Sequence, residues 1–216
     1  MGVGDWFGYL DDAYGYHQTQ PIIDDYFFPF YPPLLIQNGK YNENLNIIFG
    51  NNYDDNTFCF SFPDRNSTDV YTILIPSMGQ KWVPSVSNSY QINKCSSSRN
   101  STNRCCDLMN SIATDKMFDC NVPRIYKNLY LKSNTKPNLY WYHLNCNPEI
   151  CPQYSIEDGA GVCSHTSELP YFFGTISSYE SSTYLNCTWF NQSRLFSNEI
   201  IQHWINLATI GKLLSS

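Results

Sequence analysis

The sequence predicts an α/β fold, because it contains two strand segments with helical segments between and after them. Residues 44–49 read Asn-Leu-Asn-Ile-Ile-Phe, a largely apolar run that indicates a buried strand. Residues 138–144 are rich in tyrosine and tryptophan, side chains that favour strands. Two helices are expected before the second strand, and an amphipathic helix is expected near the end of the chain.

Length and composition indicate one folded domain. A chain of 216 residues can bury a sizeable core, and 42% hydrophobic residues exclude an intrinsically disordered chain. The formal net charge of -6 makes nucleic acid an unfavourable partner. We expect no membrane span, because prolines interrupt the most apolar segment, residues 26–36.

Cysteines and glycosylation motifs favour the secretory pathway. The chain has nine cysteines, and disulfides persist in oxidising compartments. Asn-x-Ser/Thr motifs at Asn66, Asn100, Asn186 and Asn191 are candidate glycosylation sites. The N-terminal segment has neither the basic nor the apolar region of a signal peptide, so we expect that the ancestral chain began upstream of Met1.

The cysteine spacing indicates disulfides rather than a metal site. Residues 95–106 hold three cysteines, but they contain no Cys-x-x-Cys pair and no nearby histidine. We expect an exposed, disulfide-bonded insertion there. Because nine cysteines is an odd number, at least one is free or lacks its partner. No metal and no cofactor are expected.

The first half of the chain gives few strong signals. Residues 1–19 are acidic and aromatic without periodicity, which indicates an irregular start. Residues 33–39 predict a short helical turn that ends at a glycine. The strand at 44–49 is expected to stop at Gly50 and lead into an acidic loop. Residues 59–94 allow no assignment of elements.

The second half is better marked. Asn121 is expected to cap a helix that has Pro123 in its first turn. His143 lies inside the second strand and is expected to be a packed or edge histidine. Ser197 is expected to cap the last helix, and Gly211 is expected to end it.

One stretch, residues 161–174, combines features of a catalytic loop. His165 lies among small polar residues, Glu168 follows three positions later, and an aromatic run ends at Gly174. A glutamate at that position can hydrogen-bond the loop that holds the histidine. Taken alone, a single histidine is more often a surface or packed residue than a catalytic one.

The pattern His-x-x-Glu-Leu-x-Tyr/Phe-x-Phe-Gly resembles the histidine loop of the type-B carboxylesterase and cholinesterase family. The residues that fit it are His165, Glu168, Leu169, Tyr171, Phe173 and Gly174. Segments at 20–30, 138–144 and 203–211 resemble family segments too. The resemblance implies the C-terminal part of an α/β-hydrolase, incomplete here: a doubly wound, mostly parallel sheet with flanking helices, in a partial domain spanning residues 20–216.

The resemblance also implies a catalytic acid. The family loop reads Gly-x-Asn-Lys-Asp-Glu-Gly, and its triad acid falls on Asp55. Here aspartate replaces glutamate, and Asn56 replaces glycine; the shorter acid requires the histidine loop to lie closer. The alternative is an Asp-rich turn after a strand. The separation of 110 positions between Asp55 and His165 is of the size that the family shows.

The sequence contains no nucleophile in the place where the family has one. α/β-Hydrolases order their triad as serine, acid, histidine, but the first serine here is Ser61, after Asp55. There is no Gly-x-Ser-x-Gly segment and no Gly-Gly-rich oxyanion loop. We therefore expect a partial esterase that is inactive alone; in the complete family enzyme, the substrate is a small ester.

Two alternatives to a partial esterase stay open. The same fold has neuroligin-like adhesion relatives that lack catalysis, so an extracellular binding module is the main alternative. A fragment with no function is the third, because a sheet with few strands leaves apolar surface uncovered.

Overall fold

The computed structural model describes residues 23–56, 65–98, 101–145, 163–176 and 191–213. The irregular start expected at 1–19 lies outside these ranges. Among the described residues, η2 and η3 are short 3-10 helices and η4 is a π-helical turn. The elements in chain order are α2 (Pro32–Gln37), β1 (Ile47–Asn52), α3 (Ser67–Met78), η2 (Gln80–Trp82), α4 (Val83–Tyr90), η3 (Ile92–Lys94), α5 (Cys105–Thr114), η4 (Asp115–Asp119), α6 (Asn121–Lys132), β2 (Leu139–Leu144), α7 (Leu169–Phe172) and α9 (Asn191–Ile210).

The two strands form a parallel pair, which confirms the predicted α/β class. Ile47 pairs with Leu139 and Asn52 pairs with Leu144, in unbroken register. The prediction that the first strand stops at Gly50 is wrong, because β1 continues to Asn52. Gly50 faces Tyr142 so closely that a Cβ would lie 2.0 Å from the Tyr142 carbonyl oxygen. The glycine therefore marks a close approach within the sheet, and not the end of the strand.

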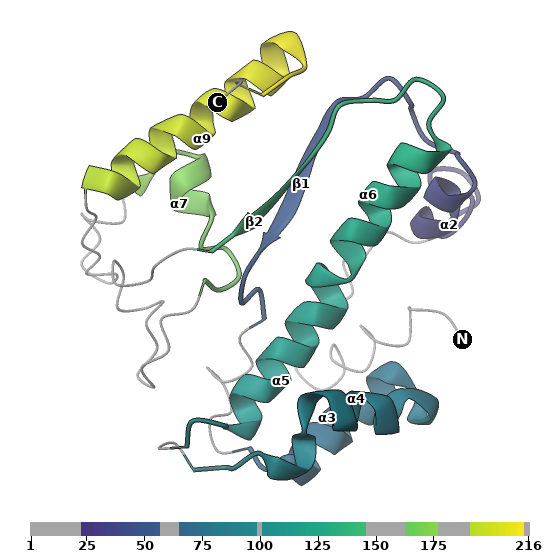
Figure 1. Ribbon diagram of the computed structural model, residues 1–216. Helices are drawn as coiled ribbons and strands as arrows, with labels where there is room; N and C mark the ends of the chain where they lie inside the picture. Colours follow the sequence, from purple (N-terminus) through teal and green to yellow (C-terminus); the bar gives the residue numbers. More distant parts are fainter. Residues whose placement is uncertain (1–22, 57–64, 99–100, 146–162, 177–190, 214–216) are drawn as a thin grey trace.

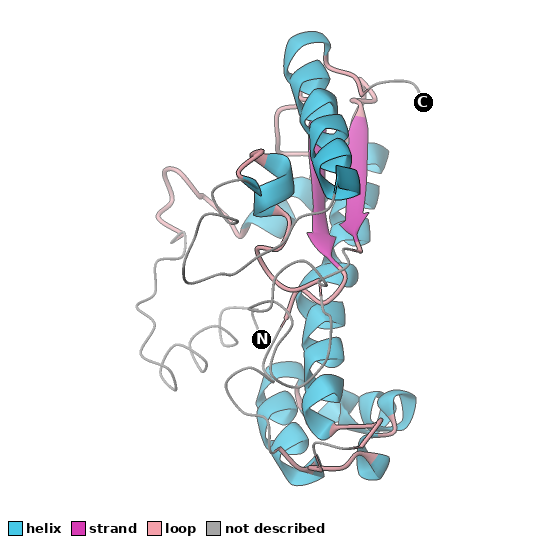
Figure 2. Ribbon diagram, turned by 90° about the vertical axis from the view of Figure 1, so that its left-hand side faces the viewer, coloured by secondary structure: helices cyan, strands magenta, loops and turns pink. Residues whose placement is uncertain are grey.

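Helices cover both faces of the strand pair. Figures 1 and 2 show the strands between α6 on one side and α7 with α9 on the other. Phe49 contacts Tyr126 of α6, with ring centroids 6.2 Å apart. Tyr142, on the opposite face, packs edge-on against Phe172 of α7 at 5.0 Å. The strands therefore lie in the middle of a three-layer arrangement, as in doubly wound folds.

A long, nearly continuous helical rod joins two parts of the molecule. It consists of α5, the π-helical turn η4 and α6, and it runs diagonally from the lower middle to the upper right of Figure 1. The helix predicted with Asn121 as its cap begins at Asn121 itself, with Cys120 at the cap position. π-Helical turns inside a helix are often found at functional sites, and η4 lies beside the loop that follows β1.

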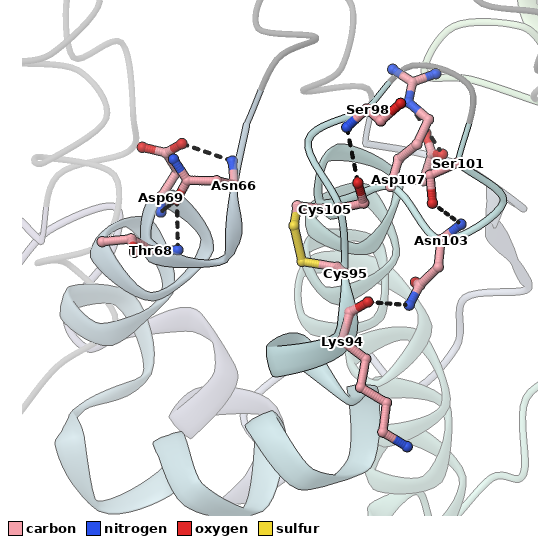
Figure 3. Close-up of a disulfide and its surroundings, with 12 residues drawn as sticks. Asn66, Thr68, Asp69, Lys94, Cys95, Ser98, Ser101, Asn103, Cys105 and Asp107 are labelled. Carbon is pink, nitrogen blue, oxygen red and sulfur yellow. Dashed lines mark hydrogen bonds and ion pairs between the residues drawn. A yellow bond between two sulfur atoms is a disulfide. The ribbon is translucent and has the colours of Figure 1, made fainter.

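A second core lies at the far end of this rod, among α3, α4, η3 and α5. Its buried side chains are Val70, Ile92, Cys105, Met109 and Ile112. This segment includes much of the region 59–94, for which the sequence allowed no assignment. The expected disulfide is present between Cys95 and Cys105 (Figure 3). Cys106 and Cys163 are also disulfide-bonded, whereas Cys120 is free and exposed.

The prediction of an exposed insertion at residues 95–106 is only partly correct. Cys105 and Cys106 open α5 and are fully buried. The segment before them folds back on itself, because the Ser96 amide donates to the Asn103 carbonyl and the Cys105 amide donates to the Ser96 carbonyl. The insertion therefore ends in the second core, and its disulfide ties the loop to that core.

The last helix begins earlier than predicted. α9 starts at Asn191, so Ser197 lies inside the helix and is buried. Its hydroxyl donates to the Tyr171 carbonyl at 2.7 Å, which attaches α9 to α7. Gly211 ends the helix as expected, with the positive φ of 72° that favours glycine. Among the described residues, none of the helices combines the length and apolar character that a bilayer span requires.

Candidate active site

The loop after β1 is attached to its surroundings on three sides. The Tyr53 amide donates to the Leu144 carbonyl at 2.9 Å, which extends the pairing with β2. The Asp54 amide donates to the Cys163 carbonyl at 3.0 Å. On the third side, the Asn56 amide donates to the Thr114 hydroxyl at 3.0 Å. Residues 53–56 are called the acid loop below.

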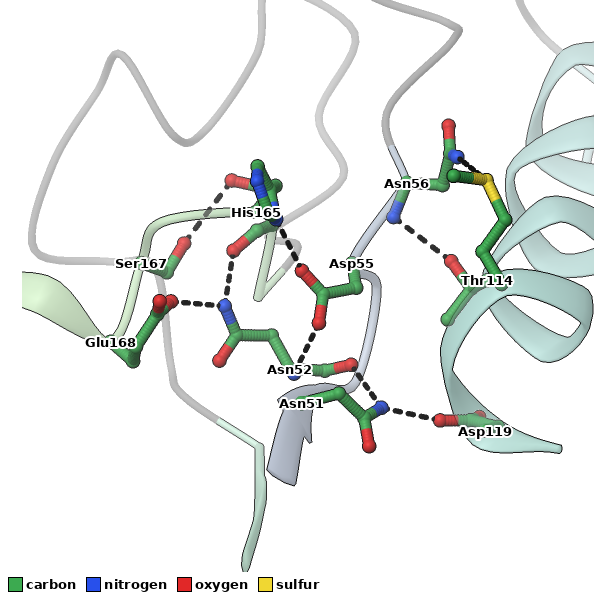
Figure 4. A network of polar contacts seen from close by, with 11 residues as sticks. Asn51, Asn52, Asp55, Asn56, Thr114, Asp119, His165, Ser167 and Glu168 are labelled. Atoms are coloured by element: carbon green, nitrogen blue, oxygen red, sulfur yellow. Dashed lines mark hydrogen bonds and ion pairs between the residues drawn. The ribbon is translucent and has the colours of Figure 1, made fainter. Parts of the chain in front are cut away.

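Asp55 is the buried carboxylate of this loop. Its side chain is 6% exposed, and the Asn52 amide donates to its Oδ2 at 2.8 Å. Its other oxygen, Oδ1, lies 2.7 Å from Nδ1 of His165 (Figure 4). The structure therefore brings together the two side chains that the sequence singled out, although they are 110 positions apart.

His165 lies in a tight turn formed by residues 164–168, called the histidine turn below. The Ser167 amide donates to the Ser164 carbonyl, and the two serine hydroxyls are 3.1 Å apart. Thr166 has a positive φ of 73° and gives the turn its sharp bend. α7 begins at Leu169, directly after this turn, so the turn is attached to the helical layer.

The short aspartate reaches the histidine because the histidine turn lies close to the acid loop. Asp54 and Ser164 form an isolated parallel bridge between the two segments. The sequence allowed a hydrogen bond between Glu168 and the loop that holds His165; among the described residues, the Glu168 side chain instead accepts from the Asn52 side chain at 2.5 Å. These two contacts bring the histidine turn close enough for the aspartate, which is shorter than the glutamate of the family pattern, to reach His165.

Charge and exposure favour a proton-transfer role for His165. The hydrogen bond to Asp55 raises the pKa of His165 above its usual value, despite the opposing effect of burial. Because a carboxylate only accepts, neutral His165 carries its proton on Nδ1 and has a lone pair on Nε2. No described residue hydrogen-bonds Nε2, and the side chain is 63% exposed. An imidazole held in this way can take a proton from a nucleophile and return it.

Features that sequence reasoning missed surround this pair. The ring of Phe118, in η4, lies 6.0 Å from the His165 ring. Thr114, at the end of α5, accepts from the acid loop as described above. Asn52 is buried and bonds both segments of the site. The sequence signal for Asn52 was the asparagine of the family loop pattern, which falls on this position, but the pattern did not indicate which groups its side chain would bond.

A second histidine–carboxylate pair lies on the other side of the strands. Nε2 of His143 is 3.6 Å from Oδ1 of Asp119, which also accepts from the Asn51 side chain. The His143 ring stacks on Tyr53 at 5.7 Å. This agrees with the expectation of an edge histidine.

Two of the four candidate glycosylation sites lie among the described residues, and both are exposed. Asn66 is exposed and caps α3, since its Oδ1 accepts from the Thr68 and Asp69 amides. Asn191 is the exposed first residue of α9. Asn100 and Asn186 lie outside the described residues, so glycosylation and secretion stay predictions. Within the described ranges, no group of three or more metal-ligating side chains is placed to hold an ion.

Comparisons with known proteins agree with the resemblance. The sequence profile described as "Carboxylesterase family" matches residues 5–213. A search of curated proteins finds no match.

Two solved esterases have a similar fold. A structure of PNB esterase superimposes with a TM-score of 0.63 at 19% identity, over 91% of this chain and 36% of that one. The crystal structure of Aspergillus niger EstA superimposes with a TM-score of 0.65 at 17% identity, over 89% of this chain and 35% of that one. The chain thus spans about a third of the length of these esterases.

Proposed function

We propose, for a chain that belongs to the carboxylesterase family, that Asp55 and His165 are the acid and base of an ester-hydrolysing triad. The observation that supports this most strongly is the hydrogen bond of 2.7 Å between a buried carboxylate and an exposed imidazole. The nucleophile of this triad is a serine that the 216-residue sequence does not contain in the required order.

Each of the two residues has a separate role in this proposal. Nε2 of His165 takes the proton from the serine hydroxyl as the serine attacks the ester carbonyl, and then gives it to the leaving alcohol. Asp55 holds the proton of the ring on Nδ1 and stabilises the imidazolium that forms. The raised pKa of His165 has the same origin, because the adjacent carboxylate favours the charged ring.

We also propose that the chain is inactive by itself. No described serine, threonine or cysteine side chain hydrogen-bonds His165, so the ring has no nucleophile to activate there. The sequence has neither a Gly-x-Ser-x-Gly segment nor a Gly-Gly-rich loop to hold an oxyanion. Loss of the triad serine alone lowers the rate by roughly a millionfold in serine proteases of this mechanism.

Two assays test the proposal. The purified chain is expected to hydrolyse p-nitrophenyl acetate no faster than its His165→Ala variant, and a clear His165-dependent rate would refute inactivity. The second assay extends the chain upstream in its own reading frame until a Gly-x-Ser-x-Gly segment is included. The extended protein is expected to hydrolyse the ester, and Asp55→Ala is expected to lower kcat by about a thousandfold or more.

The extended protein also separates the two function classes. An extension that carries the serine but turns over no ester, with or without Asp55, would contradict the triad. An upstream frame without such a serine would favour the non-catalytic binding module instead.

A further inference from the structure

Asn52 is the last residue of β1, and its side chain is fully buried beside the candidate pair. Figure 4 shows it between the acid loop and the histidine turn. Its backbone amide donates to Oδ2 of Asp55 at 2.8 Å, so the oxygen that does not face His165 is held from the strand.

The side chain of Asn52 holds the opposite half of the site. Its Nδ2 donates to the Ser164 carbonyl at 2.8 Å and to Oε2 of Glu168 at 2.5 Å. These acceptors come immediately before His165 in the chain and three residues after it. Both ends of the histidine turn are therefore bonded to one amide group.

The orientation of this amide is fixed by its neighbours. Both groups that face Nδ2 are acceptors, a carbonyl and a carboxylate, and a flipped amide would place Oδ1 against them. In the observed orientation, Oδ1 is buried and has no hydrogen-bond partner among the described residues. The fold thus keeps a buried acceptor unsatisfied while both N–H donors are used, which indicates that the donors are what the position requires.

We propose that Asn52 is the positioning residue of the site: its backbone holds Asp55, its side chain holds the histidine turn, and together they set His165 against Asp55. The inference rests on the proposed function only in treating the pair as catalytic. The contacts can be tested by the titration of the imidazole, without any turnover.

Asn51 provides a matched control. It precedes Asn52 in the same strand, and both side chains are buried. Its amide bonds Asp119 and the Asn52 carbonyl instead of the histidine turn. Replacement of either asparagine by alanine removes a buried amide from the same strand, but only Asn52→Ala removes the tether on His165.

The experiment follows the His165 ring by NMR in chain labelled with 15N and 13C histidine, with the signal assigned by its loss in His165→Ala. In the wild type, we expect a pKa above the unperturbed value of about 6.5 and an Nδ1–H resonance protected from exchange. Asn52→Ala is expected to shift the pKa back toward that value and to broaden the resonance. Asn51→Ala is expected to leave both unchanged, even if it destabilises the fold equally.

Asp55→Asn separates this inference from the proposed pair. If Asp55→Asn lowers the pKa of His165 and Asn52→Ala does not, Asn52 has no positioning role and the pair stands. If Asp55→Asn leaves the pKa unchanged, the pair itself is wrong.

A second pair of variants tests the positioning role of Asn52 if Asn52→Ala does not fold. Glu168→Gln and Glu168→Ala both remove the charge, but only glutamine still offers an oxygen to Nδ2 of Asn52. Glu168 is only partly buried, so both variants are expected to fold. A lower pKa of His165 in Glu168→Ala than in Glu168→Gln supports the tether, and equal values overturn it.

Discussion

Two histidine–carboxylate pairs among the described residues differ in nearly every respect that matters for proton transfer. In the first, the Asp55 side chain is 6% exposed and lies 2.7 Å from His165. In the second, the Asp119 side chain is 30% exposed and lies 3.6 Å from His143, which is the distance of a loose ion pair. Both pairs flank the carboxyl end of β1, so the presence of a histidine near an aspartate at this place does not by itself distinguish them.

The difference lies in how each carboxylate is held. Both oxygens of Asp55 have partners, one from the β1 backbone and one from His165. At Asp119, the same oxygen that faces His143 also accepts from Asn51. A carboxylate whose second oxygen is fixed by a backbone amide offers its first oxygen in one direction, which orients the imidazole. The comparison teaches that the support of the carboxylate by the backbone at the end of β1, more than the aspartate itself, makes the site.

The largest effect is expected from Gly50→Ala, which disrupts the strand that supports both pairs. The new Cβ would lie 2.0 Å from the Tyr142 carbonyl, so the strands have to separate locally. We expect a loss of about 3 kcal/mol in the free energy of unfolding, measured by chemical denaturation.

Gly39→Ala is the control for Gly50→Ala. Gly39 has a positive φ of 70°, but a Cβ there would meet nothing within 4 Å. The expected cost is about 1–2 kcal/mol, from backbone strain alone. Equal costs for the two variants would show that the close approach at Gly50 does not matter.

A smaller effect is expected from Asp55→Asn, compared with Asp119→Asn. An asparagine at position 55 can keep its oxygen toward the Asn52 amide, but its N–H2 group then faces Nδ1 of His165 and favours the tautomer with the proton on Nε2. Because the carboxylate that holds both partners is buried and its charge is lost, we expect a loss of about 1–3 kcal/mol. Asp119→Asn changes a side chain that is 30% exposed and is expected to cost less than about 1 kcal/mol. A larger loss at Asp119 in the same denaturation experiment would reverse the comparison.

The site could be predicted from the sequence to the extent that its chemistry is local. The motif around His165 and the acid loop around Asp55 led to the two side chains that the structure places together. The second strand was also predictable, because the run of aromatic residues at 139–144 has no competing signal. In each case, the residue types that carry the signal lie within one short segment.

Features that depend on partners far away in the chain could not be predicted. Gly50 reads as the end of a strand until Tyr142 is placed beside it. The local sequence around Ser197 predicts a helix cap, because it gives no indication of the hydrogen bond to the Tyr171 carbonyl. The helices α3 and α4 are weakly marked in sequence, and their core forms only with α5 and the disulfide. The side-chain bonds of Asn52 belong to this group as well, since the partners lie more than a hundred residues away.

The smallest expected effect is a pH dependence that belongs to the first pair. The hydrogen bond to Asp55 raises the pKa of His165, so the folded chain binds this proton more tightly than the unfolded chain does. The resulting stability is fully present below the unfolded pKa of about 6.5 and is lost as pH rises through the folded pKa. Because the ring is largely exposed, solvent screening keeps the effect small.

His165→Gln isolates this contribution, because it keeps a polar side chain that does not titrate. The difference in unfolding free energy between the wild type and this variant is expected to be largest near about pH 5.5 and to shrink toward about pH 9. In the Asp55→Asn background, the same substitution is expected to give a difference that no longer falls as pH rises, since the group that favours the charged ring is absent. A pH-dependent difference that persists without Asp55 would assign the proton to another partner, and the contrast between the two pairs would then rest on distance alone.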